Sequence, residues 1–364
     1  MSSNFNQLDQ LHKIGNISEL TNSLDGFRYM IIKSLGRNEN YVEILDRNAI
    51  DRNGVNFRKY PELIFKSSLT NDEIVDFINT KFKSQSEIRN LNEEDLIVQL
   101  YKLRVFDWGG VYQNDINKFI VDNYVKKYTN YDNLLNAIDN EVIESLRGFT
   151  LCSWYNNWTS IIIEDIFNRH NRVIPAVGRI KMIDFFIDKI PFDLKVTYFP
   201  AGFMGIKRRE MDLPALEISE LKKICRRYGI SYDSNRSDTD LISDIISMLS
   251  ETSILGAKHE YDEFLKRRSK IIMDTMQEPY NLIKWLYENQ GAQRFDASNR
   301  IFLILVDTKN PEESWKLKRN KQLLESRISD FLDEFPVSLK KMRIDWSIEG
   351  NSYVSYASIL FIFK

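Results

Sequence analysis

Apolar residues recur every three to four positions through most of the first 150 residues. This helical spacing runs through residues 73–82, 94–103, 116–128 and 134–146, as expected when one face of each helix packs against a core. Asp-Arg-Asn-Gly at 51–54 is a turn signal within a less regular stretch. We therefore expect residues 1–150 to form a mainly helical N-terminal region.

The rest of the chain adds the two-residue alternation that is typical of β-strands. Strands are predicted at 172–177, at 180–188, within 191–199, at 300–307, at 340–348 and at 353–363. Helices are predicted at 159–170, 279–290 and 312–335. This order of one helix, three strands, a helix, a strand, a helix and two further strands is typical of a three-layer α/β core.

A helical insertion is predicted to interrupt this core. Gly202 and Gly205 favour a loop over residues 200–213, and residues 214–276 show helical spacing. We assign the core to 151–200 and 279–364, and the insertion to 201–278.

Composition narrows the classes of function. Of the 364 residues, 43% are apolar and 28% are charged, which is typical of a folded globular protein. The net charge of −2 provides no overall basic field, so any nucleic-acid contact must use local patches. The two cysteines do not support a disulfide framework, and they fit a reducing cytoplasm.

Several other classes are not expected. No apolar window approaches the ~18 residues that span a bilayer, and the polar first residues do not resemble a signal peptide. Three histidines and two cysteines argue against a structural zinc site. The sequence has no glycine-rich phosphate loop, so we expect no nucleotide cofactor. Because no apolar window is long enough, we also expect no membrane partner.

The candidate chemistry lies in a predicted hairpin at residues 183–197. Strand alternation puts Asp193, Lys195 and Thr197 on one face and Leu194 and Val196 on the other. With Lys189-Ile190 as the turn, Asp184 faces Lys195, Phe186 faces Asp193 and Asp188 faces Pro191. Two carboxylates and an ammonium then share one side of the hairpin. Two carboxylates can hold Mg²⁺ and leave positions for water and a phosphate, and a neighbouring lysine can orient the water.

This arrangement resembles the core of the PD-(D/E)xK nucleases, the superfamily of most type II restriction endonucleases. In that family a hairpin carries one acid, and then an acid, any residue and a lysine, as Asp184 and Asp193-Leu194-Lys195 do here. An acid on the preceding helix often joins them, and Glu164 lies at the edge of the apolar stripe of residues 159–170. Ile183 stands where the family often has proline.

The resemblance implies a restriction-endonuclease-like fold with a mixed central sheet, and a role for each candidate residue. Asp184, Asp193 and the backbone carbonyl of Leu194 would hold Mg²⁺, for which Mn²⁺ could substitute. Lys195 would serve the attacking water, and Glu164 would assist a second metal or a bound water. It implies a Mg²⁺-dependent endonuclease that cuts double-stranded DNA at a specific site, as a homodimer when both strands of a palindrome are cut.

Two other acid–x–Lys triplets compete with this assignment. One is Glu220-Leu221-Lys222, and the other is Asp307-Thr308-Lys309, which has Asp296 upstream. The continuous apolar run of 301–306 predicts a central strand that is buried on both faces, with Asp307 emerging at its end. The alternating hairpin is therefore the favoured site, while a solvated salt bridge on an edge hairpin is the alternative explanation of its charges.

The insertion resembles the SAP-type DNA-binding module over residues 216–245. The similarity consists of a helix with Leu-Lys and a small apolar cysteine, a Gly-Ile turn, and a second helix that begins with Leu-Ile. The Gly-x-Lys usual between the two helices is absent, and an ordinary helical hairpin is an equal alternative. The candidate DNA contacts are basic side chains: Lys207, Arg208, Arg209, Lys222, Lys223, Arg226 and Arg227.

Two alternatives to a restriction enzyme stay open from sequence. One is another nuclease on the same core, acting in repair, in phage defence or on RNA. The other is a non-catalytic nucleic-acid-binding protein whose hairpin charges are structural.

Overall fold

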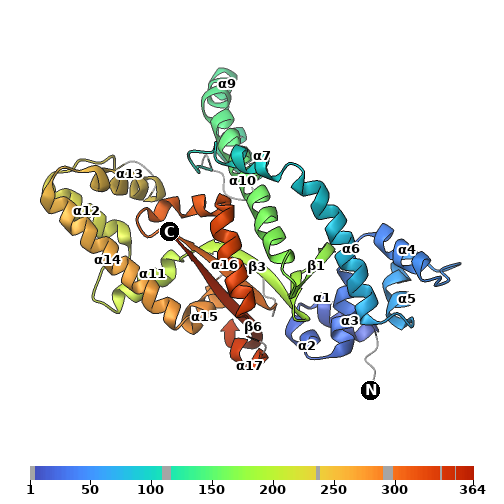
Figure 1. The fold of residues 1–364 in the computed structure, drawn as a ribbon. Coiled ribbons are helices and arrows are strands. Elements are labelled where there is room, and N and C mark those ends of the chain that lie inside the picture. The colour runs from blue at the N-terminus through green and yellow to red at the C-terminus, as the bar shows by residue number, and fades with distance from the viewer. Residues whose placement is uncertain (1–4, 109–115, 235–237, 290–297, 337, 349) are drawn as a thin grey trace.

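A mixed six-stranded sheet lies at the centre of the molecule (Figure 1). The computed structural model describes residues 5–108, 116–234, 238–289, 298–336, 338–348 and 350–364. The strands follow the order β1-β2-β3-β4-β6-β5 across the sheet. Their bounds are β1 Val173–Ile180, β2 Ile183–Ile187, β3 Ile190–Tyr198, β4 Arg300–Val306, β5 Arg343–Ile348 and β6 Asn351–Phe363.

The sheet combines two hydrogen-bonding patterns. β1, β2 and β3 pair antiparallel to one another, whereas β3, β4 and β6 run parallel and β5 pairs antiparallel with β6. Every residue of β4 is buried, as the continuous apolar run predicted. The predicted α/β class with a mixed sheet is therefore confirmed.

The N-terminal region is helical, as its apolar spacing predicted. Its longest early helix, α6, begins with a capping box in which Thr70 and Glu73 each bond the backbone of the other. The elements before the sheet are α1 Phe5–Lys13, α2 Ile17–Thr21, α3 Leu24–Lys33, α4 Asn38–Arg47, η1 Phe57–Lys59, α5 Tyr60–Lys66, α6 Asn71–Asn90, α7 Glu93–Leu100, α8 Ile116–Ile120, η2 Val121–Val125, α9 Tyr131–Ala137, η3 Ile138–Val142 and α10 Ile143–Asn168.

The helices after β3 differ from the prediction in two places. Residues 201–209 form a helix, α11, rather than a loop, and residues 312–335 divide into a 3₁₀ segment and α16. The elements are α11 Ala201–Arg209, α12 Glu217–Tyr228, α13 Asp238–Glu251, α14 Leu255–Gln277, α15 Tyr280–Asn289, η4 Pro311–Arg319, α16 Lys321–Asp333 and α17 Leu339–Met342. None of the helices in the described part of the chain combines the length and the apolar character that a membrane span requires.

Helices cover both faces of the sheet, which makes three layers. On one face, α10, η4 and α16 pack against β2, β3 and β4 in a shared core. On the other face, α3 and α6 cover β1 and β2, while α14 and α15 cover β4, β5 and β6. The second face is thus covered by two separate groups of helices.

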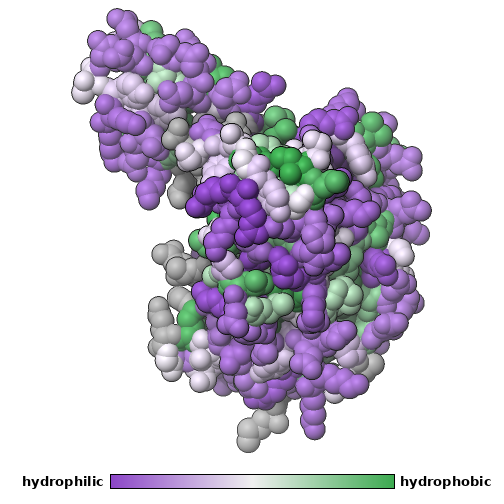
Figure 2. Space-filling model, turned by 90° about the vertical axis from the view of Figure 1, so that its left-hand side faces the viewer, coloured by the Kyte–Doolittle hydropathy of each residue, from purple (hydrophilic) through white to green (hydrophobic). Residues whose placement is uncertain are grey.

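Two helical parts extend from this body (Figure 1). Helices α12, α13 and α14 of the insertion share their own apolar cluster, so the insertion has a small core of its own. A second, small cluster joins α8, η2, α9 and η3 into an arm. Figure 2 shows this arm standing clear of the body, whose visible face is mostly hydrophilic.

The N-terminal region meets the sheet at a glycine–glycine contact. A Cβ on Gly36 would lie 2.7 Å from the Cα of Gly178, and a Cβ on Gly178 would lie 2.4 Å from the carbonyl oxygen of Leu35. The Gly178 N–H donates to the Ser34 carbonyl oxygen at 2.7 Å. This close backbone approach requires glycine on both sides, and it fixes the N-terminal region against β1.

Candidate active site

The hairpin that carries the candidate acids turns one residue earlier than predicted. Asp188 and Lys189 have φ angles of 48° and 71°, and positive φ at both central residues is the signature of a type I′ turn. β2 and β3 therefore pair Phe186 with Pro191 and Ile187 with Ile190. The predicted Lys189-Ile190 turn is wrong, and Asp188 lies in the turn itself, paired with Arg172.

The corrected register brings the two candidate acids together. The pairing of β2 with β3 ends at Phe185 and Phe192, so one further step sets Asp184 opposite Asp193 rather than opposite Lys195. Beyond this point β3 pairs with β4. The Leu194 N–H donates to a side chain of β2 rather than to a backbone carbonyl: it bonds Asp184 Oδ2 at 2.7 Å. The carboxylate of Asp184 thus occupies the fork where β2 and β3 separate.

The Leu194 carbonyl is directed toward the same fork. In a β-strand, the N–H and C=O of one residue point to the same side of the strand. Since the Leu194 N–H points to Asp184, its carbonyl oxygen points to the same side. Backbone geometry therefore agrees with the ligand role that the resemblance implied for this carbonyl.

Asp193 lies between two cations. Lys195 Nζ is 2.6 Å from its Oδ1, and Arg300 Nε is 3.3 Å from its Oδ2. Asp193 is buried, and Leu194 packs in the opposite core with α10, so the predicted alternation along β3 is confirmed. Arg300 was not predicted as a site residue, because its contact depends on the pairing of β3 with β4 across more than 100 residues. The only signal in the sequence is a charged residue at the start of an apolar strand.

Glu164 joins the site from α10. Ile162, Ile163 and Phe167 bury their side chains against the sheet, and Glu164 lies half-buried beside them. Burial and the neighbouring Asp184 carboxylate raise the pKa of Glu164 to about 7. Burial and the Asp193 carboxylate likewise raise the pKa of Asp184 to about 6. Glu164 and Asp184 therefore interact electrostatically, and so do Asp184 and Asp193, while Glu164 approaches from the α10 side of the sheet.

This donor set fits a hard divalent cation. Mg²⁺ is commonly held by one or two carboxylates and keeps several waters, and it favours oxygen ligands such as those of Asp184, Asp193 and the Leu194 carbonyl. Neighbouring carboxylates repel one another, which raises their pKa values, and a cation that binds between them removes this repulsion. In the described part of the chain, no three acid, histidine or cysteine side chains stand close enough together to hold a metal ion by themselves.

The competing triplet at 307–309 has a structural environment. Asp307 is buried, and its Oδ1 accepts the backbone N–H groups of Lys309 at 3.1 Å and Asn310 at 2.9 Å. The carboxylate therefore holds the turn after β4. Asp296 lies outside the described residues.

The third triplet is also structural. Glu220 accepts Arg208 and Arg267 on its two carboxylate oxygens. Arg208 is fully buried and also donates to the Pro214 carbonyl oxygen. Burial excludes Arg208 from the predicted phosphate contacts, because its guanidinium connects α11 to α12 within the insertion.

The other predicted DNA contacts lie nearer the surface. Lys207 pairs with Glu210 at 2.8 Å, and Arg209 is exposed. On α12, Lys223 and Arg226 are exposed and Lys222 is half-buried. Arg227 is exposed but pairs with Glu260 at 2.5 Å. Helix α12 ends at Gly229 in a left-handed conformation, as the Gly-Ile turn predicted.

Comparison with known proteins does not identify this chain. No protein-family model, no curated protein and no solved structure matches it.

Proposed function

We propose that this protein is a Mg²⁺-dependent DNA endonuclease with a PD-(D/E)xK-type active site, and that it acts as a type II restriction endonuclease. The observation that carries the proposal is the pair of acids at the fork between β2 and β3, Asp184 and Asp193, with Lys195 bonded to Asp193. Glu164 interacts electrostatically with Asp184. The mixed central sheet with helices on both faces is compatible with the three-layer core that the family resemblance implies.

Each residue has a distinct chemical task in this proposal. Asp184, Asp193 and the Leu194 carbonyl would hold Mg²⁺, which would supply charge stabilisation for the attacking and leaving oxygens. The Lys195 ammonium would donate a hydrogen bond to the scissile phosphate and orient the attacking water. Glu164, with its pKa raised to about 7, would accept a proton from a water near neutral pH. The water oxygen bonds to phosphorus as the P–O bond to the leaving strand breaks.

Arg300 supports the site without touching the reacting atoms. Its guanidinium pairs with Asp193 and lies 4.9 Å from the centroid of the Tyr287 ring. When Lys195 moves to a phosphate, Arg300 still neutralises Asp193. We therefore assign Arg300 as a positioning residue.

Double-stranded DNA is the proposed substrate, with the N-terminal region and the insertion as its binding surfaces. Exposed cations on α11 and α12 would contact phosphates without sequence preference. A homodimer would place two active sites on the two strands of a palindromic sequence.

A non-catalytic nucleic-acid-binding protein is the second candidate, and one observation favours it. Asp193 already accepts ion pairs from Lys195 and Arg300, which would satisfy a purely structural carboxylate. In that case the hairpin charges stabilise the sheet, and DNA binding requires no metal.

Cleavage of supercoiled plasmid by the purified full-length protein distinguishes the two candidates. We expect nicked and linear DNA with MgCl₂ or MnCl₂ and none with EDTA. Discrete fragments indicate a restriction enzyme, whereas a smear indicates a nuclease of another kind on the same core. DNA binding without cleavage in either metal would overturn the catalytic proposal in favour of the second candidate.

A further inference from the structure

Three exposed cations lie where the N-terminal helices meet the end of the β1–β2 hairpin. Arg37 precedes α4, Arg179 is the second-last residue of β1, and Lys181 lies in the turn to β2. No described residue forms a hydrogen bond or an ion pair with any of these three side chains. Exposed cations without a protein partner keep their charge available for an anionic ligand.

The contact between Gly36 and Gly178 brings two of these cations together. Arg37 follows Gly36 in the chain, and Arg179 follows Gly178. A Cβ on Gly36 would lie only 2.8 Å from the backbone nitrogen of Arg179. The two arginines, which are distant in the sequence, therefore leave the backbone at neighbouring points.

Two lysines of α1 and α3 extend this group of cations. Lys13 and Lys33 both contact Asp9, with nitrogen-to-oxygen distances of 2.7 and 3.5 Å. His12 Nε2 lies 3.1 Å from the Lys181 carbonyl oxygen. Burial lowers the pKa of His12, and the ammonium groups of Lys33 and Lys181 lower it further. Both lysines therefore lie near the same imidazole ring.

These contacts define a basic patch on a chain that is slightly acidic overall. Residues 9–13, 33–39 and 178–182 together contain five basic side chains and two acids, Asp9 and Glu39. The net charge of the whole chain is −2, so the excess of cations is local. The basic patch consists of Lys13, Lys33, Arg37, Arg179 and Lys181.

The basic patch lies next to the candidate metal site. Lys181 precedes Asp184 by three residues, which an extended chain spans in at most about 11 Å. Each strand of B-DNA carries a phosphate every ~3.4 Å of helix axis. When one phosphate is held at Asp184, its neighbours along the strand therefore fall within reach of the patch.

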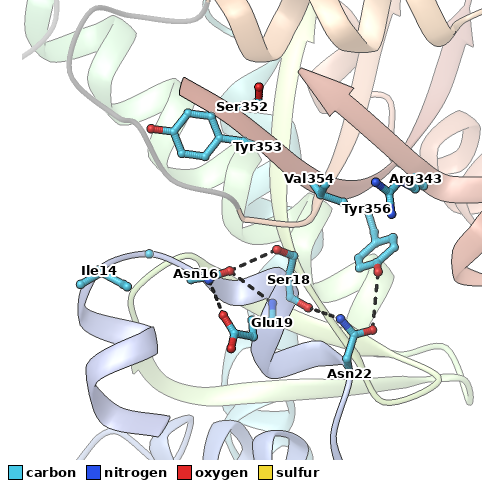
Figure 3. Close-up of a pocket in the computed structure, with 11 residues that line it drawn as sticks. Ile14, Asn16, Ser18, Glu19, Asn22, Arg343, Ser352, Tyr353, Val354 and Tyr356 are labelled. Carbon is cyan, nitrogen blue, oxygen red and sulfur yellow. Dashed lines mark hydrogen bonds between the residues drawn. The ribbon is translucent and has the colours of Figure 1, made fainter. Parts of the chain in front are cut away.

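Hydrogen bonds hold the N-terminal helices against the strands around the metal site. The Asn299 side-chain amide donates to Thr21 Oγ1 on α2 at 2.9 Å and to the Pro191 carbonyl oxygen on β3 at 3.1 Å. Figure 3 shows a second link, in which the Tyr356 hydroxyl of β6 lies 3.5 Å from the Asn22 side-chain oxygen of α2. A surface that is already fixed in place loses little conformational freedom when it binds a ligand.

We infer that the basic patch binds the phosphate backbone of double-stranded DNA on one side of the cleavage position. The inference rests on the proposed function, because it identifies a substrate contact beside the proposed active site. The cations that the sequence suggested on α11 and α12 are less available, since Arg208 is buried and Lys207 and Arg227 are paired. The basic patch should therefore contribute more to DNA affinity than α12 does.

The salt dependence of DNA binding tests the basic patch without cleavage. A fluorescently labelled duplex in EDTA would be titrated with the full-length protein at about 50–200 mM NaCl and followed by anisotropy. Replacing Arg37, Arg179 and Lys181 together with glutamine should lower the log–log slope by up to roughly 2.7, at about 0.9 for each phosphate contact. A slope lower by this amount weakens binding at 0.1 M salt about 500-fold relative to binding at 1 M.

Two further variants separate loss of charge in the basic patch from loss of charge elsewhere. Arg37→Lys with Arg179→Lys and Lys181→Arg keeps the three charges and should keep the wild-type slope. Lys102→Gln with Arg104→Gln removes two exposed cations of the same kinds and spacing as Arg179 and Lys181, from the segment after α7 that packs on the α10 side of the sheet. This matched control should leave the slope near the wild-type value.

The possible outcomes keep the basic patch and the proposed function apart. An unchanged slope in the glutamine variant of a protein that cuts plasmid would overturn the patch alone. An equal fall in the Lys102 and Arg104 variant would also overturn it, because binding would then follow total charge. Loss of binding to phosphatidylserine vesicles with unchanged DNA binding would assign the patch to a membrane surface instead. Patch-dependent DNA binding by a protein that never cuts DNA would support the patch and overturn the nuclease proposal.

Discussion

The triplets Asp193-Leu194-Lys195 and Asp307-Thr308-Lys309 share one spacing but differ in what surrounds the acid. Asp193 faces a second carboxylate and two side-chain cations, whereas Asp307 accepts two backbone N–H groups of its own turn. Both N–H groups bond Oδ1 of Asp307 and Lys364 Nζ lies 3.6 Å from its Oδ2, so this carboxylate has a structural task in the turn. A carboxylate among other acids is costly to the fold and favours a cation. The residues around each acid, rather than the spacing of the triplet, therefore distinguish a candidate active site from a structural turn.

Replacing Asp193 should mainly lower activity, whereas replacing Asp307 should mainly lower stability. Asp193→Ala should lower plasmid cleavage about a thousandfold or more, because a metal ligand supplies several kcal/mol of charge stabilisation. Asp307→Ala should leave the cleavage rate near wild type but lower the free energy of unfolding by about 1–3 kcal/mol, since two N–H groups lose their acceptor. Cleavage rates and urea denaturation measure the two effects. If only Asp307→Ala abolished cutting, the active site would belong to the second triplet.

The two lysines should differ in the same way. Lys195→Ala should lower cleavage roughly a hundredfold while metal and DNA binding persist, because its ammonium serves the water and the phosphate. Lys195→Arg should not restore activity, because a planar guanidinium cannot replace a compact ammonium. Lys309→Ala is the matched control, since Asp307 contacts the backbone of Lys309 and not its side chain. Full activity of Lys195→Arg would contradict the orienting role.

The raised pKa values of Asp184 and Glu164 predict how stability depends on pH. From about pH 4 to 7 the folded state keeps protons that the unfolded state has released, so the free energy of unfolding should fall as the pH rises through this window. Asp184→Asn should stabilise the metal-free protein at pH 8 by about 1–3 kcal/mol and have little effect at pH 4. Urea denaturation at both pH values measures the free energy of unfolding. Asp307→Asn is the control, and it should destabilise the protein at both pH values.

Metal binding should show the opposite pH dependence. The apparent affinity for Mg²⁺ should rise between pH 6 and 8, because the cation must displace the protons on these two acids. An affinity for Mg²⁺ that does not change over this range would argue against Asp184 as a ligand.

The smallest effect is expected at the third triplet, on the insertion. Replacing Lys222, Lys223, Arg226 and Arg227 together with glutamine should flatten the salt dependence of DNA binding. The log–log slope should fall by roughly 0.9 for each phosphate that no longer has a cationic partner. Cleavage at saturating DNA should persist, because these side chains lie on α12, outside the candidate site. An unchanged slope would show that α12 does not contact DNA.

The sequence predicted the local elements better than the contacts between them. Alternation identified β2 and β3 and the shared face of Asp193 and Lys195, because a strand's period is visible in its own residues. The turn was misplaced by one residue because Asp188 and Lys189, neither of them glycine, adopt positive φ. Arg300 was missed because its place beside Asp193 depends on pairing between distant strands.

The error in α11 has a different cause. Gly202 and Gly205 favoured a loop, but each makes room for a close neighbour within a helix: a Cβ on Gly202 would lie 2.7 Å from the Trp285 ring, and one on Gly205 would lie 3.1 Å from the Ala215 carbonyl oxygen. Arg208 of the same helix is buried, where it pairs with Glu220 and lies over the Phe264 ring. Tertiary contacts that a single sequence does not reveal thus changed both an element and a predicted DNA contact.

The contact between Gly36 and Gly178 has a consequence for how this molecule can vary. A single methyl group on either glycine would overlap backbone atoms across this contact, so the N-terminal helices and β1 would have to move apart. Substitutions of exposed residues on the N-terminal helices change side chains and do not touch this backbone contact. The two glycines therefore keep the N-terminal region in register with the sheet while its exposed residues are free to diverge.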